Sequence, residues 1–181
     1  LGTLANTQNV AVLPTSAGLF KSVVAGKYYL ASTAYRDVGT PNVSIGSELK
    51  QMTTQAPLLW ASHFMSETIL APTVQRDTNG FDYGWHYFPL DYCLSNQNLS
   101  ATLILTIGVS IGDYGDSGIM LQSGAKLISE GRPETLNRLV KFNTVQAGTN
   151  VFGTNSGTYY GLLEMTNTPA VRADIHLRFT E

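Results

Sequence analysis

Charged side chains are scarce in this sequence of 181 residues: Asp, Glu, Lys and Arg make up only 13% of it, and the net charge is −2. Soluble domains are typically about 25% charged. The eleven Lys and Arg residues are scattered from Lys21 to Arg178. Because a protein that grips phosphates gathers several cations on one face, we expect no direct nucleic-acid binding by this chain.

Cysteine and long apolar runs are also lacking. The single cysteine, Cys93, excludes an internal disulfide framework and any zinc site built on several cysteines. No apolar run approaches the ~18 residues of a membrane span, and no signal peptide is recognisable. We therefore expect no membrane span. The first residue is Leu1, which is compatible with a processed product or with part of a longer chain.

The residues that are abundant indicate β structure. Short apolar stretches alternate with Gly, Pro and Asn, as in proteins made of strands and turns. The stretch 172–180 places Ile175, Leu177 and Phe179 on one side and polar residues on the other. This alternation predicts an antiparallel strand with one wet face and those three side chains buried together.

Helix is expected at two places only. The stretch 47–52 is compatible with a short helical turn capped by Ser47, and 132–142 has Pro133 at a favourable first position. We predict an all-β domain over residues 1–181, an antiparallel β-sandwich of jelly-roll type with about eight strands and one or two short helices. Residues 1–18 are expected to form an extended N-terminal arm.

The segment "GDYGDSGIMLQ" raises the possibility of an enzyme. Its Gly-Asp-Ser-Gly resembles the surroundings of the nucleophilic serine in chymotrypsin-like proteases, with Ser117 as nucleophile, His63 as base and Asp82 or Asp91 as acid. The interval between His63 and Ser117 is too short to complete one barrel and build most of a second. We therefore expect a glycine-rich turn and no enzymatic activity, with a serine protease as the less favoured alternative.

Two acidic turns are candidate calcium sites. Asp77 and Asp82 flank Gly80 in "RDTNGFDYG", which resembles part of a calcium-binding loop but lacks the distal glutamate of an EF-hand. Asn79-Gly80 also predicts a hairpin turn, so both interpretations stay open.

The second acidic turn holds Asp113 and Asp116. Either pair of aspartates needs a neighbouring subunit to complete a calcium shell, so calcium is expected, if at all, at subunit interfaces. The three histidines, His63, His86 and His176, lie far apart in predicted strands; structural roles are favoured over a shared zinc site.

The final stretch, "GTYYGLLEMTNTPAVRADIHLRFTE" (157–181), resembles the end of the single jelly-roll coat proteins of small icosahedral RNA viruses. The resemblance implies a structural subunit of a viral capsid that self-assembles into an icosahedral shell and is located in the virion. Its implied partners are copies of itself and other capsid proteins. The basic RNA-binding arm of that family has no counterpart in this sequence.

A binding module is the main alternative. The aromatic segment "FDYGWHYF" (81–88) is dense enough to form a surface for a carbohydrate or a receptor on a projecting β-sandwich. Core and interface packing is the more common reason for such a cluster.

Overall fold

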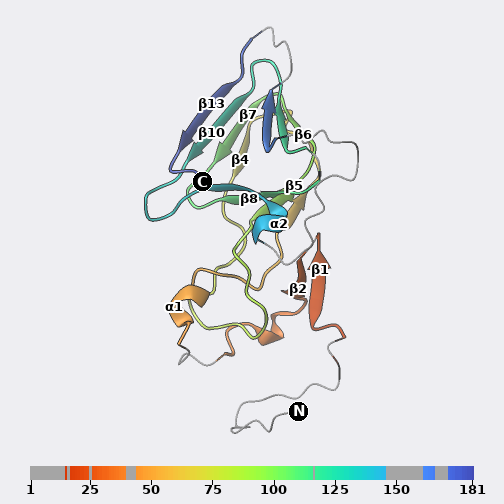
Figure 1. Cartoon of the computed structure of the whole chain (residues 1–181), viewed down its shortest axis with the longest axis vertical. Coiled ribbons are helices and arrows are strands. Elements are labelled where there is room, and N and C mark those ends of the chain that lie inside the picture. Colours follow the sequence, from red (N-terminus) through yellow and green to blue (C-terminus); the bar gives the residue numbers. More distant parts are fainter. Residues whose placement is uncertain are drawn as a thin grey trace.

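Short β-strands dominate the described part of the chain (Figure 1). The computed structural model describes residues 15, 17–24, 26–39, 44–115, 117–145, 161–165 and 171–181. The helical elements are η1 (Thr33–Tyr35), α1 (Gly46–Leu49) and α2 (Phe142–Val145). The strands are β1 (Phe20–Val23), β2 (Gly26–Leu30), β3 (Leu58–Trp60), β4 (Thr68–Leu70), β5 (Tyr92–Leu94), β6 (Gln97–Leu99), β7 (Thr102–Leu105), β8 (Ser110–Asp113), β9 (Ile119–Leu121), β10 (Lys126–Glu130), β11 (Arg138–Lys141), β12 (Leu163–Met165) and β13 (Asp174–Arg178).

Strands β3 to β13 wind into a parallel β-helix. They form three sheets with the orders β11-β8-β5-β3, β12-β9-β6 and β13-β10-β7-β4, and every pair within these sheets is parallel. The chain visits the three sheets in turn, so each coil adds one strand to each sheet. In the first coil a single bridge between Phe64 and Leu99 takes the place of a strand in the second sheet. The last coil contains β11, β12 and β13.

The prediction of an antiparallel jelly-roll sandwich is wrong. Within the described residues the only antiparallel ladder joins β1 to β2, while the sheets of the β-helix are parallel. Alternation of apolar and polar residues reports that one face of a strand is buried. It does not report the direction of the neighbouring strand, because that is set by where the chain goes between strands.

The interior of the β-helix is filled by stacked apolar side chains. On one sheet Leu103 pairs with Leu127, and on another Tyr92 pairs with Ile111, which pairs with Leu139. Equivalent residues on successive coils therefore lie one above another. The buried members of this cluster are Phe64, Leu70, Tyr92, Leu94, Leu99, Leu103, Leu105, Val109, Ile111, Ile119, Leu121, Ala125, Leu127 and Leu139.

The last coil departs from the predicted burial. Ile175 pairs with Leu127 and Leu177 with Ser129, so both lie on the inward-facing row as the alternation predicts. They are nevertheless 39% and 48% exposed, because no further coil of the described chain covers them. Phe179 lies beyond the end of β13 with a positive φ of 48° and is also exposed. The predicted common burial of these three residues is therefore wrong.

The predicted helices are only partly correct. A helix does form near 47–52, but α1 starts one residue earlier, and its N-cap is Ile45 rather than Ser47. The predicted helix at 132–142 is wrong, since β11 occupies residues 138–141 and pairs with β8. The predicted arm at 1–18 lies mostly outside the described residues. None of the helices in the described ranges is long and apolar enough to cross a membrane.

A second layer of structure, the loop layer, lies beside the β-helix and holds the β1–β2 hairpin, η1 and α1 (Figure 1). The loop between β4 and β5 runs through it. A two-way backbone bridge joins Thr53 to Tyr87, and the ring of Tyr87 packs 4.7 Å from that of Tyr29. The layer is therefore held together by contacts among segments that are distant in sequence, and these contacts position the acidic site described next.

Candidate metal centre

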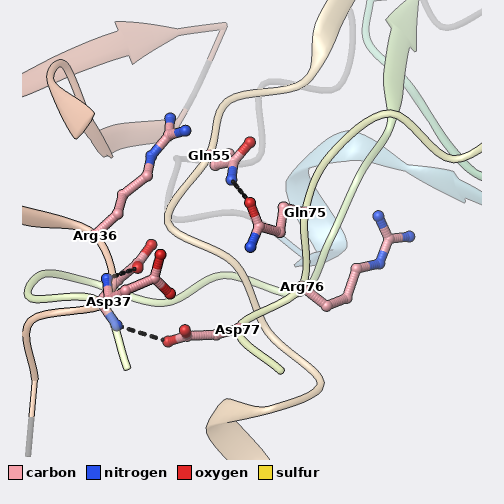
Figure 2. A pocket seen from close by; sticks show the side chains of 7 residues that line it. Arg36, Asp37, Gln55, Gln75, Arg76 and Asp77 are labelled. Carbon is pink, nitrogen blue, oxygen red and sulfur yellow. Dashed lines mark hydrogen bonds between the residues drawn. The ribbon is translucent and has the colours of Figure 1, made fainter. Parts of the chain in front are cut away.

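Three aspartates from two distant segments converge in the loop layer. Asp37 follows η1, whereas Asp77 and Asp82 lie in the loop between β4 and β5, and one carboxylate oxygen from each lies within 4.8 Å of the others. They line a small pocket together with polar side chains that include Gln55 and Gln75 (Figure 2). The pocket has room for about one water-sized occupant.

Close backbone contact brings the two segments together. The amide of Gly39 donates to the carbonyl of Phe81 at 2.6 Å, and a Cβ on Gly39 would lie only 2.7 Å from that carbonyl oxygen. Gly80 similarly approaches Asp37, where a Cβ would meet the Asp37 Cα at 3.0 Å. Asp37 itself has a positive φ of 58°, a conformation that Asp tolerates better than most residues. The missing side chains of Gly39 and Gly80 and the positive φ of Asp37 thus allow the two segments to lie close together.

This arrangement replaces the predicted hairpin at Asn79-Gly80. The described residues 71–91 contain no strand, so no hairpin ladder flanks this turn. Gly80 also does not have the positive φ that a type I′ turn requires. Its lack of a side chain serves the contact with Asp37 instead.

Asp77 is the most buried member of the site. Its side chain is only 2% exposed. Its Oδ2 accepts a hydrogen bond from the Asp82 amide at 2.9 Å and lies 2.7 Å from Nε2 of His86. Its Oδ1 is buried and has no hydrogen-bond partner among the described residues. The contacts of Oδ2 therefore position the carboxylate, while Oδ1 remains available to bind a ligand.

His86 lies directly beside Asp77. Its Nδ1 lies 3.2 Å from the carbonyl oxygen of Gly84, and its Nε2 faces the Asp77 carboxylate. Both of these oxygens are hydrogen-bond acceptors, so both ring nitrogens already face polar neighbours within the described chain.

The other two carboxylates are held by hydrogen bonds to neighbouring loops. Asp82 Oδ1 accepts from the Asp37 amide at 2.9 Å, and its Oδ2 accepts from the Thr54 hydroxyl. Asp37 Oδ1 accepts from the Gly80 amide at 3.3 Å. These bonds fix the orientation of the cluster before any ligand arrives.

The two arginines that line the pocket point away from the carboxylates. In Figure 2 the side chain of Arg36 extends to one side of Asp37, and that of Arg76 extends to the opposite side of the pocket. The guanidinium of Arg76 binds Asp91 instead, at 2.7 and 3.0 Å. Neither arginine forms an ion pair with the three aspartates.

The structure separates the residues that the sequence suggested as calcium ligands. Asp77 and Asp82 come together with Asp37, which the sequence did not single out because it lies far from both along the chain. Asp113 lies at the end of β8, where its side chain is fully buried and paired with Lys141. Burial raises the pKa of Asp113, and Lys141 partly offsets this increase. Asp116 lies outside the described residues.

The residues of the suggested protease triad make other contacts. His63 Nδ1 accepts from the amide of Asn98 at 3.2 Å, and Asp91 is bound by Arg76. Within the described residues Ser117 and His63 form no hydrogen bond with each other; the Ser117 carbonyl accepts from Asn96 at 2.7 Å. The histidines likewise form no three-ligand group in this part of the chain.

The chain matches no protein-family model, no curated protein and no solved structure. Two features of the described chain bear on its function: the acidic site and the exposed last coil.

Proposed function

We propose that the chain is a structural subunit that assembles with copies of itself through the last coil of its β-helix. The observation that carries the proposal is the exposure of the inward-facing residues Ile175 and Leu177. Repeat proteins of this kind need a polar terminal repeat to be soluble, and contiguous apolar surface usually marks a contact site.

Unpaired strand edges are further evidence that the last coil forms the contact between copies. β11, β12 and β13 are each the last strand of their sheet. The C-terminal residues 179–181 pair with the outer side of β11, where the Leu139 amide donates to the Glu181 carbonyl at 2.8 Å, whereas no described strand pairs with the outer sides of β12 and β13. Such edges are templates for pairing with another chain. A two-fold contact between identical edges places the strands of the two copies antiparallel, which satisfies both backbones and covers both apolar rows.

Two exposed ion pairs involve residues of the last coil. Lys126 pairs with Asp174 at 3.4 Å, and Arg138 pairs with Glu181 at 3.0 Å, all with exposed side chains. An apolar centre with a polar rim is the usual anatomy of a protein interface. The low charge of the whole chain agrees with a surface that is partly covered by neighbours.

The proposal keeps self-assembly but not the jelly-roll shell. The resemblance to jelly-roll coat proteins was architectural, and the sheets of this chain are parallel. A viral location therefore stays a prediction from the sequence resemblance alone.

Sedimentation of two matched variants tests the proposal. Leu177→Lys places a charge on the proposed contact, and Ile45→Lys places one at a comparably exposed position in the loop layer. We expect wild type and Ile45→Lys to associate at micromolar concentration and Leu177→Lys to remain a monomer. Association that is unchanged in Leu177→Lys, or a monomeric wild type at every concentration, contradicts the proposal.

A ligand-binding surface is a second candidate, favoured by exposed aromatic rings. Tyr28 of β2 and Trp85 of the segment 81–88 are 46% and 56% exposed, and their ring centroids lie 6.5 Å apart. Phe20 extends the group, with its ring 5.8 Å from that of Tyr28. Flat exposed rings of this kind stack against the apolar faces of sugars or against planar ligands.

Tryptophan fluorescence tests this second candidate. The other tryptophan, Trp60, stacks on Phe64 in the β-helix at 5.3 Å, so Trp60→Phe leaves Trp85 as the reporter. Binding of soluble oligosaccharides should change the emission of this variant, and Tyr28→Ala should abolish the change. An emission spectrum that no oligosaccharide alters argues against carbohydrate as the ligand.

A further inference from the structure

We infer that Asp37, Asp77 and Asp82 form a calcium site that fastens the segment after η1 to the loop between β4 and β5. This site lies in the loop layer and does not depend on the proposed assembly through the last coil. Three observations carry the inference: the mutual approach of the carboxylates, the unpartnered oxygen of Asp77 and the nature of the surrounding donors.

The approach of the carboxylates leaves negative charge without an adequate counterion. One oxygen from each of the three aspartates lies within 4.8 Å of the others. Arg36 and Arg76 line the same pocket but form no ion pair with the three aspartates among the described residues, and His86 lies against Asp77 on the side of Oδ2. Like charges at this separation repel each other, and most strongly where burial excludes water, as it does around Asp77. A divalent cation among the three oxygens turns the repulsion into attraction.

The unpartnered oxygen of Asp77 marks where the cation binds. A buried carboxylate oxygen normally accepts at least one hydrogen bond, because leaving it without a partner carries the full cost of removing it from water. Asp77 Oδ1 has no such partner in the described chain, and its residue lines the pocket between Asp37 and Asp82. In Figure 2 the Asp77 carboxylate points toward Asp37 and away from Arg76. A cation in the pocket completes its coordination.

The donors around the pocket select calcium. All three charged ligands are oxygens, and the amide side chains of Gln55 and Gln75 line the same pocket. Hard oxygen ligands favour calcium or magnesium, while zinc prefers nitrogen and sulfur. Both ring nitrogens of His86 already face other acceptors.

Geometry separates calcium from magnesium. The ligands come from loops rather than from helices or strands, and each aspartate accepts a hydrogen bond from a backbone amide. Calcium accepts six to eight oxygens at variable angles, whereas magnesium demands a near-ideal octahedron. Three carboxylates with the side-chain amides of Gln55 and Gln75 beside them therefore suit calcium better than magnesium.

Melting of the full chain tests the site. After treatment with EDTA, the protein is titrated with CaCl₂ and, separately, with MgCl₂, while calorimetry records the stoichiometry. We expect one calcium ion per chain and a rise in melting temperature with calcium, because an ion that binds the folded state alone stabilises it. The rise in melting temperature with MgCl₂ should be clearly smaller.

Three variants assign the binding to these residues. Asp37→Asn and Asp77→Asn should each weaken calcium binding roughly tenfold or more, since even outer-shell changes have effects of this size. Asp174→Asn is the matched control, because Asp174 is exposed and pairs with Lys126 in the β-helix; it should bind calcium as wild type does. If Asp77→Asn fails to fold, Asp37→Asn at its exposed position still provides the test.

Three results would overturn the inference. The first is a melting temperature that calcium leaves unchanged up to about 10 mM, beyond the weakest affinities of natural calcium modules. The second is undiminished calcium binding by Asp37→Asn. The third is an equal response to magnesium, which overturns the assignment to calcium.

Discussion

Arg76 and Asp91 form a two-pronged ion pair at the junction between the loop layer and the β-helix. Nη1 lies 2.7 Å from Oδ1 and Nη2 lies 3.0 Å from Oδ2. The Asp91 side chain is fully buried and also accepts from the amides of Thr73, Val74 and Ser110. One carboxylate thus joins the loop after β4 to the first residue of β8.

Removing one partner of this pair should be costly. Arg76→Ala leaves a buried carboxylate without its counterion, so we expect the free energy of unfolding to fall by ~3–5 kcal/mol. Arg138→Ala is the control, because its pair with Glu181 is exposed and should contribute at most ~1 kcal/mol. Urea unfolding of both variants measures the difference. Equal losses would show that Asp91 is held by its backbone donors alone.

The inward row of the third sheet should show a steep gradient in stability. Leu127→Ala opens a cavity in the interior and should cost ~2–5 kcal/mol. Ile175→Ala, one coil further on the same row, should cost under ~1 kcal/mol in the monomer because its side chain is already half solvated. Denaturant unfolding at low protein concentration makes the comparison. A large loss for Ile175→Ala would indicate that this row is covered.

Gly118 should tolerate no side chain. Its amide donates to the Gly161 carbonyl at 3.3 Å, and an added Cβ would lie 2.1 Å from the Leu162 carbonyl oxygen. Gly118→Ala should therefore push apart the coils that contain β9 and β12, at about 3 kcal/mol. The neighbouring Ser117→Ala should change stability by less than ~1 kcal/mol. Thermal melting of the two variants measures both losses. A larger loss for Ser117→Ala than for Gly118→Ala would contradict the structural role assigned to Gly118.

Asp113 should make the protein less stable as pH rises. Burial raises its pKa above the usual 3.8, with Lys141 acting in the opposite direction. Folding therefore favours the protonated carboxyl, and this contribution is fully present below pH 3.8 and is lost as pH rises through the folded-state pKa. Asp113→Asn removes the effect, so its stability relative to wild type should increase from pH 4 upward. Urea unfolding from pH 4 to 7 follows the difference, and a difference that stays constant over that range contradicts it.

Local patterns predicted parts of the fold correctly. The alternation in 172–180 placed Ile175 and Leu177 on the same face of one strand, and both do lie on the inward row of β13. The alternation could not show that this face is open, because exposure depends on whether another coil follows. Pro133 at a favourable first helical position predicted a helix over 132–142, where β11 pairs with β8. Short apolar runs are compatible with either structure until tertiary contacts decide.

The repeating architecture was hidden by unequal coils. Leu58 pairs with Tyr92, Tyr92 with Ile111, and Ile111 with Leu139, so the spacing between equivalent residues changes from coil to coil. Repeat proteins are recognised in sequence by a constant period. Insertions of different length between the strands remove that period while leaving the stacking intact.

The sequence by itself determined the β character of the chain, its weakly charged surface and the acidic turn around Gly80, because propensity and composition act locally. It also identified Asp77 and Asp82 as a pair. Only the tertiary structure brought Asp37 to them, through the close approach of Gly39 to Phe81 and of Gly80 to Asp37. It also decided that the strands are parallel and that Asp113 is buried against Lys141. These outcomes depend on which distant segments meet, and pairing between distant segments is set by the path of the whole chain rather than by any short stretch of it.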